Sequence, residues 1–507
     1  MATDPECSVW DAGPFLRTPD PFNLTDHTLR AGRATPDKVA LEVITAPGRI
    51  AEAWRFEELE AAIRATMTGL ASHGLKRGDR LLLRLGHSVD FPILFFAATG
   101  LGAIPIPSSS QWTAREVAEA AAVAQPKLTA TAPGIEPGPG RHIEAETYRG
   151  WRSLPPADFA TTQPDDPAFL IFTSGTGGQP KGVLHAHRSG WARRMMWRDW
   201  MDLRPTDRVL HAGAFNWTYT LGTGLTDPWA AGATALVYAG RPDRQVWPTL
   251  LARHGATIFA AAPGVYRQIL QDEALIPRLP RLRHGLSAGD TLPPTLAATW
   301  EERTGTRLHE ALGMSEVSTY ASASPHEPAM HPQRGRRVAV LDIDGSALPH
   351  DTPGHLAVSA RDPGLMLGYW RGPDLPPDLP THGEWFDTGD TATLSPDGVL
   401  THLGRADDIL NAQGYRVSPV EVETVLLAHP AVTEAAVVTR ALRADVTHIV
   451  AFVVLRTPEM DIEADILAHC SLNLARYKCP RAVYAVPEMP RTATGKLRRS
   501  ALRMGSI

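Results

Sequence analysis

Apolar runs of strand length alternate with helix-length segments through the first two thirds of the chain. Residues 80–85 have the apolar content of a buried strand, residues 91–101 that of a helix, and residues 103–106 that of a second strand. This order predicts a βαβ unit. The same alternation recurs at further apolar runs, at residues 168–172, 208–211, 233–238 and 256–260. We therefore expect parallel sheets covered by helices.

The pattern changes twice farther along the chain. After about residue 325, alternating and turn-rich segments such as 337–341 and 355–359 favour an antiparallel subdomain. After Gly404, helices are expected near residues 419–429 and 462–474, with strands near 435–438, 448–454 and 483–486. The predicted fold class is α/β, with a large domain (1–404) of doubly wound sheets and a small antiparallel β subdomain. A small, mobile α+β domain (405–507) follows it.

Composition narrows the function classes. A length of 507 residues suits two to four compact units, and a net charge of −5 without a basic, aromatic-rich stripe argues against nucleic acid as a partner. Three cysteines without C-x-x-C spacing give no sign of a disulfide framework or a zinc site. The apolar stretch 91–107 is broken by Gly and Pro, so we interpret it as buried core rather than a membrane span. These features predict a cytoplasmic enzyme.

The sharpest local signal is Thr-Ser-Gly-Thr-Gly-Gly-Gln-Pro-Lys-Gly at residues 173–182, directly after the apolar run 168–172. Glycines let backbone N–H groups approach phosphate oxygens, hydroxyls add donors, and the lysine adds positive charge. The alternative is a flexible tip of a hairpin. As a phosphate-binding loop, the segment would use Thr173, Ser174, Gly175, Thr176, Gly177, Gly178 and Lys181.

This segment resembles the signature loop of the adenylate-forming (AMP-binding) superfamily, which includes acyl-CoA synthetases, luciferases and peptide-synthetase adenylation domains. Further motifs stand in the family's order at residues 287–290, 310–316, 386–390, 404–408, 413–416 and 492–496. The pattern is most similar to medium-chain and benzoate-type acyl-CoA synthetases. The resemblance implies that a carboxylic acid and MgATP give an acyl-adenylate and pyrophosphate, after which coenzyme A displaces AMP. ATP, Mg²⁺ and coenzyme A are the implied cofactors.

The resemblance also implies roles for single residues. Glu316 would hold Mg²⁺, Asp390 would accept hydrogen bonds from the ribose, and Lys496 would bridge the carboxylate and the α-phosphate. Each has a plain alternative: a solvated carboxylate, a turn residue and a basic tail. Arg405 and Arg416 would reach the ribose or α-phosphate, or pair with nearby carboxylates. The remaining nucleotide contacts are expected at Ser287, Ala288, Gly289, Asp290, Glu310, Ala311, Leu312, Gly313 and Ser315.

The thiol and acid sites are placed by the same resemblance. Asp407 would be the hinge of the small domain, and Gln413, Gly414 and Tyr415 would line the tunnel for coenzyme A. The acid pocket is expected at Asn216, Trp217, Tyr219 and Tyr266. Asn216 is neutral where amino-acid-activating relatives offer an aspartate, so amino acids are disfavoured. The aromatic residues indicate an aromatic or medium-chain acid, although they also suit a core.

The sequence departs from the pattern of the adenylate-forming superfamily at two places, and these departures leave other hypotheses open. Leu312 stands where many relatives place a tyrosine, and residues 440–445 lack a segment that often contacts coenzyme A. One alternative is a stand-alone adenylation enzyme that loads a carrier protein, and another is an inactive nucleotide-binding regulator. Acetylation of Lys496 by a lysine acetyltransferase and a homodimer are further hypotheses, with a small-molecule carboxylate as substrate.

Overall fold

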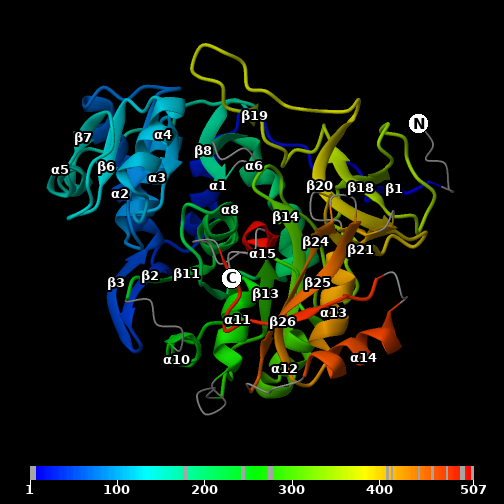
Figure 1. Cartoon of the computed structure of the whole chain (residues 1–507). Coiled ribbons are helices and arrows are strands. Elements are labelled where there is room, and N and C mark those ends of the chain that lie inside the picture. Colours follow the sequence, from blue (N-terminus) through cyan, green and yellow to red (C-terminus); the bar gives the residue numbers. More distant parts are fainter. Residues whose placement is uncertain are drawn as a thin grey trace.

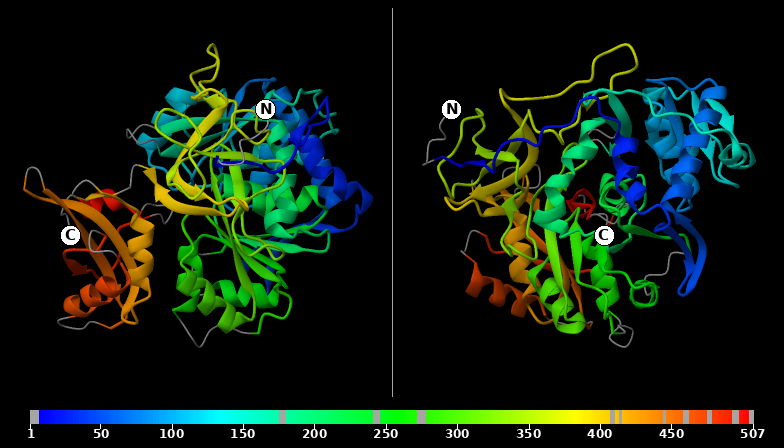
Figure 2. Two further views of the ribbon diagram at one scale, coloured as in Figure 1. Left: turned by 90° about the vertical axis from the view of Figure 1, so that its right-hand side faces the viewer. Right: turned by 180° about the vertical axis from the view of Figure 1, so that it is seen from behind.

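The computed structural model describes residues 7–174, 180–240, 246–271, 278–406, 410–412, 415–443, 446–457, 462–474, 478–491 and 497–503. Figure 1 shows a large body, coloured blue to yellow, and a smaller C-terminal unit in orange and red. The left view of Figure 2 places this small unit to one side of the large body. No helix among the described residues is long and apolar enough to cross a membrane.

The central sheet of the large body has nine strands in the order β16-β15-β14-β13-β12-β10-β11-β2-β3. Its middle strands, from β14 to β2, all run parallel, whereas β3 pairs antiparallel with β2, β15 with β14, and β16 with β15. The apolar runs expected near 208, 233 and 256 are therefore neighbours here. The strands are β2 Val39–Ala46, β3 Arg49–Arg55, β10 Arg208–His211, β11 Thr234–Tyr238, β12 Ile258–Ala261, β13 His284–Ala288, β14 Arg307–Met314, β15 Ser318–Ser322 and β16 His331–Pro332.

A second parallel sheet contains the predicted βαβ unit. Strand β4 (Arg80–Arg84) lies between β5 (Ile104–Pro107) and β6 (Leu128–Thr131), and β7 (Arg141–Ile143) follows at the edge. Its helices are α2 (Phe56–Ser72), α3 (Asp90–Gly100) and α4 (Ala114–Ala124). The two parallel sheets confirm the expected fold class.

The run at 168–172 does not continue the parallel pattern. It lies in β8 (Pro167–Ser174), which pairs antiparallel with β9 (Pro180–Ala186) in a separate sheet completed by β19 (Gly368–Tyr369). Only a few residues connect β8 to β9, whereas a parallel pairing needs a crossover of a dozen or more. The expectation that this run belongs to a parallel sheet was therefore wrong.

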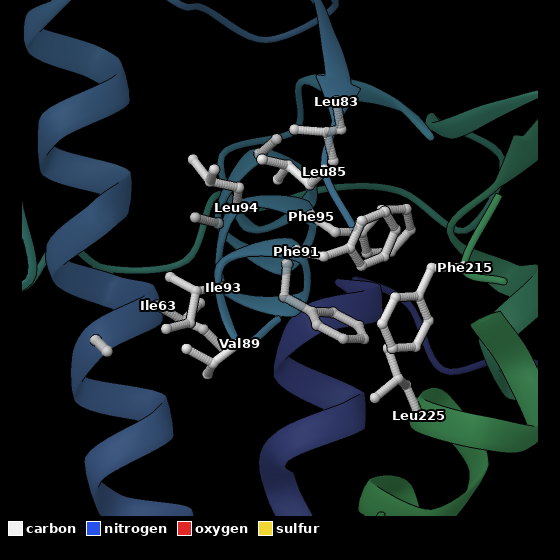
Figure 3. Packing of buried hydrophobic residues seen from close by; sticks show 14 of the residues in the cluster. Ile63, Leu83, Leu85, Val89, Phe91, Ile93, Leu94, Phe95, Phe215 and Leu225 are labelled. Atoms are coloured by element: carbon white, nitrogen blue, oxygen red, sulfur yellow. The ribbon is translucent and has the colours of Figure 1, made fainter. Parts of the chain in front are cut away.

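Helix α3 is enclosed on all sides by the core. Every residue from Asp90 to Gly100 is buried, as the apolar stretch predicted. Figure 3 shows Phe91 facing Phe215, and the two rings stack with centroids 4.7 Å apart. Because Phe215 lies in the loop after β10, this contact anchors the segment that carries Trp217 and Tyr219.

Antiparallel structure follows, as expected. A five-stranded sheet has the order β1-β17-β18-β20-β21, formed by β1 Val9–Asp11, β17 Arg337–Leu341, β18 Gly354–Ser359, β20 Trp385–Leu394 and β21 Leu400–Arg405. The small unit combines β24 (Val432–Arg443), β25 (Val446–Leu455) and β26 (Val483–Ala485) with helices α13 (Pro419–Leu427) and α14 (Glu463–Asn473). This is the predicted α+β arrangement, in which β24 and β25 are longer than the sequence pattern indicated and β26 is one residue shorter.

Candidate active site

Two expected nucleotide motifs meet at the carboxyl edge of the central sheet. Strands β13 and β14 run parallel with Ser287 opposite Glu310 and Ala288 opposite Ala311. Ligands of open α/β sheets bind outside this edge, where side chains and backbone amides are not used by the ladder. Residues 287–290 and 310–313 are therefore brought together, although their nearest ends lie 20 positions apart in the chain.

Glu310 is half-buried at this edge. Its Oε1 accepts a hydrogen bond of 2.7 Å from the backbone N–H of Leu292. Burial raises the pKa of Glu310 to about 7, and nearby Asp290 adds to the increase, while the Leu292 hydrogen bond and His402 oppose it. The carboxyl group thus titrates near neutral pH.

Asp390 is held at a meeting point of two strands. On β20 it lies opposite Arg405 of β21, and Arg405 Nη1 lies 3.3 Å from Asp390 Oδ1. The Tyr320 hydroxyl donates to Asp390 Oδ2 at 3.2 Å, and His402 Nε2 lies 3.4 Å from Oδ1. Burial alone would raise the pKa of Asp390, but these partners outweigh it and the net pKa is lowered. An ionised carboxylate is thereby kept as an acceptor.

Glu316 and Lys181 converge on one aromatic residue. The hydroxyl of Tyr369 donates to Glu316 Oε1 at 3.0 Å, and Lys181 Nζ lies 4.9 Å from the centroid of the Tyr369 ring. Thr173 lies opposite Lys181 in the β8–β9 ladder, so the start of the phosphate loop is at the same place. A carboxylate near a lysine suits a bound MgATP, because oxygen ligands hold Mg²⁺ and the cation faces phosphate.

A cavity of about 440 Å³ opens beside this edge. Its walls include Trp217 and Tyr219, whose rings meet edge to face with centroids 5.1 Å apart. The other lining residues are Arg193, Thr218, Thr223, Ala288, Gly289, Gly313, Met314, Ser315, Ser318 and Thr319. We name it the acid cavity, because the acid pocket is expected from the sequence at Trp217 and Tyr219. Two of the four expected acid-pocket residues line it.

The other two do not line this cavity. Tyr266 belongs to the core of helix α11 (Pro263–Leu270), where its hydroxyl lies 2.7 Å from the carbonyl oxygen of Phe259. Asn216 is half-buried beside Trp217 in sequence but is not part of the cavity wall. Its neutral side chain therefore does not face the acid cavity.

Two larger cavities lie between the large body and the small unit. One, of about 1140 Å³, is lined by Trp217 and Gly289 on one side and by Glu434 and Met489 on the other. The other, of about 890 Å³, joins Asp290, Arg405 and Leu497. Leu497 directly follows Lys496 in the chain, so the described neighbour of the expected catalytic lysine faces the nucleotide motifs.

Several expected site residues lie outside the described residues. They are Gly175, Thr176, Gly177, Gly178, Asp407, Gln413, Gly414 and Lys496. For Ser174, Tyr415 and Arg416 only the backbone is described. Their roles stay predictions, as do those of the other site residues.

The structure adds residues that the motifs did not include. Tyr320 and His402 contact Asp390, Tyr369 contacts Glu316, and Arg193 lines the acid cavity. For Tyr369, the aromatic pair in the Gly-Tyr-Trp sequence at 368–370 was a visible signal. For Tyr320 and His402 the only signal was their neighbourhood to the motifs at 310–316 and 404–408.

Comparison with known proteins decides the family. The protein family described as "AMP-binding enzyme" matches residues 29–370, and the family described as "AMP-binding enzyme C-terminal domain" matches residues 421–496. The chain belongs to the AMP-binding enzyme family. The benzoate–CoA ligase of Thauera aromatica is 31% identical over 532 residues, covering 97% of this chain and 97% of the relative.

Two more relatives are similar to this AMP-binding enzyme along most of its length, one in sequence and one in structure. The 3-hydroxybenzoate–CoA ligase of Aromatoleum sp. (strain CIB) is 30% identical and covers 88% of this chain and 91% of the relative. The crystal structure of an anthranilate CoA ligase in complex with anthranoyl-AMP has a TM-score of 0.87 at 27% identity, covering 96% of this chain and 99% of that one. The predicted family, fold and acid–thiol ligase class are confirmed. ATP and coenzyme A are substrates of such ligases.

Proposed function

We propose that this AMP-binding enzyme activates a benzoate-type aromatic acid with MgATP and transfers the acyl group to coenzyme A. The observation that carries the proposal is the acid cavity. Its walls pair Trp217 with Tyr219, and it opens against the ends of β13 and β14, where the nucleotide motifs meet. A flat aromatic ring fits between such walls, with its carboxylate toward Gly289 and Ser315.

In the first half-reaction the carboxylate oxygen attacks the α-phosphorus of ATP, and pyrophosphate leaves. Asp390 would accept hydrogen bonds from the ribose hydroxyls, with Arg405 beside it. Glu316 would hold Mg²⁺, and Lys181 would neutralise phosphate charge. Lys496 would stabilise the charge that develops between the carboxylate and the α-phosphate. These groups act by position and charge.

In the second half-reaction the thiolate of coenzyme A attacks the acyl carbonyl, and AMP leaves. The cavity of about 1140 Å³ supports this route, because it reaches Trp217 and Gly289 of the acid cavity from between the two units. A pantetheine arm has the slender shape that such a passage admits. We propose a domain boundary between residues 404 and 405, with Asp407 as the pivot. Acetylation of Lys496, a homodimer and a cytoplasmic location stay predictions.

Pyrophosphate release with MgATP tests the proposal across a panel of benzoate, medium-chain acids and amino acids, each with and without coenzyme A. We expect turnover on the aromatic acids, with coenzyme A required for multiple turnovers and free pantetheine a poor substitute. A response only to medium-chain acids would contradict the aromatic assignment. Multiple turnover only with a pantetheinylated carrier protein would favour the carrier-loading alternative.

A further inference from the structure

Arg193 lies between two cavities in the interior of the large body. It lines the acid cavity, and it also lines a second cavity of about 500 Å³ behind it. Thr218 and Ser318 are shared by both walls as well. Arg193 is only 9% exposed, whereas Gly289 and Ser315, which also line the acid cavity, are half-buried. The arginine therefore forms the inner end of the acid cavity.

The guanidinium of Arg193 is fixed by a two-point ion pair. Its Nε and Nη2 donate to Asp227 Oδ1 and Oδ2 at 2.9 and 2.6 Å, and Asp227 is 1% exposed. A further bond of 3.2 Å joins Nη2 to Thr223 Oγ1. Gly222 provides the room, because a Cβ there would lie 2.0 Å from Arg193 Cζ. The orientation of the guanidinium is thus set before any substrate enters.

Arg193 and Ser318 can still donate hydrogen bonds to a ligand in the acid cavity. Nη1 donates one N–H to Ser318 Oγ at 2.6 Å. A guanidinium has five N–H groups, and the contacts within the described part of the chain use four of them. The remaining N–H belongs to Nη1. Ser318 accepts from Arg193, so its own hydroxyl proton is available to a ligand in the acid cavity.

Ser318 is held in a costly backbone conformation. Its φ of 74° is in the left-handed region that favours glycine. Across the strand pair, a Cβ on Gly313 would lie 2.6 Å from the Ser318 carbonyl oxygen, so the bend is tightly packed. Backbone strain of this kind persists where the surroundings enforce it, often at ligand sites. Here it places a hydroxyl beside Arg193 on the cavity wall.

Charge defines the ligand that this end accepts. Asp227 neutralises Arg193, so a second carboxylate would gain little from the pair and would lose its hydration. An ammonium group on the ligand would meet only hydrogen-bond donors and could not pair with them. A neutral acceptor, such as a phenolic hydroxyl or a carbonyl oxygen, can receive the remaining N–H and the Ser318 proton. An unsubstituted or methyl-bearing ring would leave both donors buried without a partner.

We propose that Arg193, oriented by Asp227 and assisted by Ser318, selects aromatic acids with a hydroxyl or another neutral hydrogen-bond acceptor on the ring. The inference rests on the proposed function, because it assumes that an aromatic acid occupies the acid cavity. Arg193 is then a specificity-determining residue, and its role is independent of nucleotide and thiol binding.

The test compares near-isosteric acids. We would measure kcat/KM by pyrophosphate release for 3- and 4-hydroxybenzoate against 3- and 4-methylbenzoate, with benzoate as reference. A buried donor left without a partner costs roughly a ten- to a hundredfold loss of kcat/KM, and we expect this preference for at least one hydroxybenzoate over its methyl analogue. The paired variant Arg193→Met with Asp227→Leu removes the donor without leaving a lone buried charge. In it the hydroxyl-to-methyl preference should fall to within about threefold of unity, and kcat/KM for benzoate, measured beside it, shows how far the variant still turns over an aromatic acid.

Control variants separate specificity from folding. The buried ion pair of Arg336 and Asp362 is of the same kind, but neither residue lines the acid cavity, so Arg336→Met with Asp362→Leu should keep the preference. Ser318→Ala, the smaller change, should reduce the preference several-fold and keeps the test valid if the paired variant does not fold. Benzoate turnover with an unchanged hydroxyl-to-methyl ratio in the Arg193 and Ser318 variants overturns the inference alone. Absence of turnover on every aromatic acid overturns the proposed function and the inference with it.

Discussion

Arg405 and Asp390 face each other across the β20–β21 pair, with Nη1 of the arginine 3.3 Å from Oδ1 of the aspartate. Gly389 beside them has φ +72°, and a Cβ there would lie 2.4 Å from Arg405 Nη2. The glycine therefore leaves the space that the guanidinium occupies. The pair holds an ionised acceptor next to Arg405, which lines the cavity of about 890 Å³ between the large body and the small unit.

The Asp390→Asn variant should lose affinity for ATP. The amide offers a weaker, uncharged acceptor to the ribose hydroxyls, and hydrogen bonds to charged groups contribute about 1.5–3 kcal/mol. We expect the KM for ATP to rise roughly ten- to a hundredfold at saturating acid, measured by pyrophosphate release. Asp387→Asn is the matched control, because Asp387 lies on the same strand but is exposed. An equal effect in both variants would contradict the ribose role.

Filling the space at Gly289 should impair acid activation. A Cβ at this position would lie 2.6 Å from Trp217 Cζ2, so the indole in the wall of the acid cavity would have to shift. Gly289→Ala should lower kcat/KM for the aromatic acid at least about tenfold, since a displaced wall disturbs the reacting geometry. Gly74→Ala controls for backbone strain, because Gly74 has a similar φ of +86° and no atom within 4 Å of an added Cβ. Equal activity of the two variants would contradict the binding of the substrate acid in the acid cavity.

Glu310 should make stability fall as the pH rises through neutrality. Its pKa is about 7 in the folded protein against an ordinary 4.5, because burial disfavours the charged form. A carboxyl group with a raised folded pKa costs nothing below its unfolded pKa and its full amount above the folded one, here up to about 3 kcal/mol. Glu310→Gln removes that cost, so its Tm should exceed that of the wild type at pH 8 and match it near pH 4.5. Parallel Tm profiles would contradict the raised pKa.

The packing of α2 on Trp151 gives a prediction that is independent of the active site. A Cβ on Gly69 would lie 2.2 Å from Trp151 Cδ2 and Cγ. Overpacking costs about 1–3 kcal/mol, more than the roughly 1 kcal/mol that alanine gains over glycine in a helix. Gly69→Ala should therefore shift the urea midpoint downward. Gly150→Ala, where an added Cβ meets no atom within 4 Å, should leave the midpoint unchanged or raise it.

The sequence predicted those parts of the fold that depend on local pattern. Residues 80–106 show apolar runs of strand and helix length, and the structure has β4, α3 and β5 there. The direction of a strand was harder to predict from the sequence, because β8 has the same apolar content as the parallel strands. The antiparallel pairing follows from the few residues between β8 and β9, which we interpreted from the sequence as a phosphate-binding loop rather than as a hairpin connection.

Site partners distant in sequence were beyond pattern analysis. Tyr320 and Asp390 are 70 residues apart, and only the packing of two sheets brings them together. The sequence pattern could not distinguish the roles of Tyr219 and Tyr266, since both follow a strand of the central sheet. One lines the acid cavity and the other packs on Trp300, with ring centroids 4.9 Å apart. Arg193 carried no motif at all, so its place at the acid cavity became visible only in three dimensions.

The central claim is that this enzyme joins an aromatic acid to coenzyme A through an acyl-adenylate. The most direct measurement is product analysis by mass spectrometry after incubation of benzoate, hydroxybenzoates, MgATP and coenzyme A with wild type and Lys496→Ala. We predict one aryl-CoA thioester and one AMP for each pyrophosphate released, with both products lost in the variant. Formation of ADP and phosphate with the thioester, or of AMP without any aryl-CoA while coenzyme A is present, would contradict it.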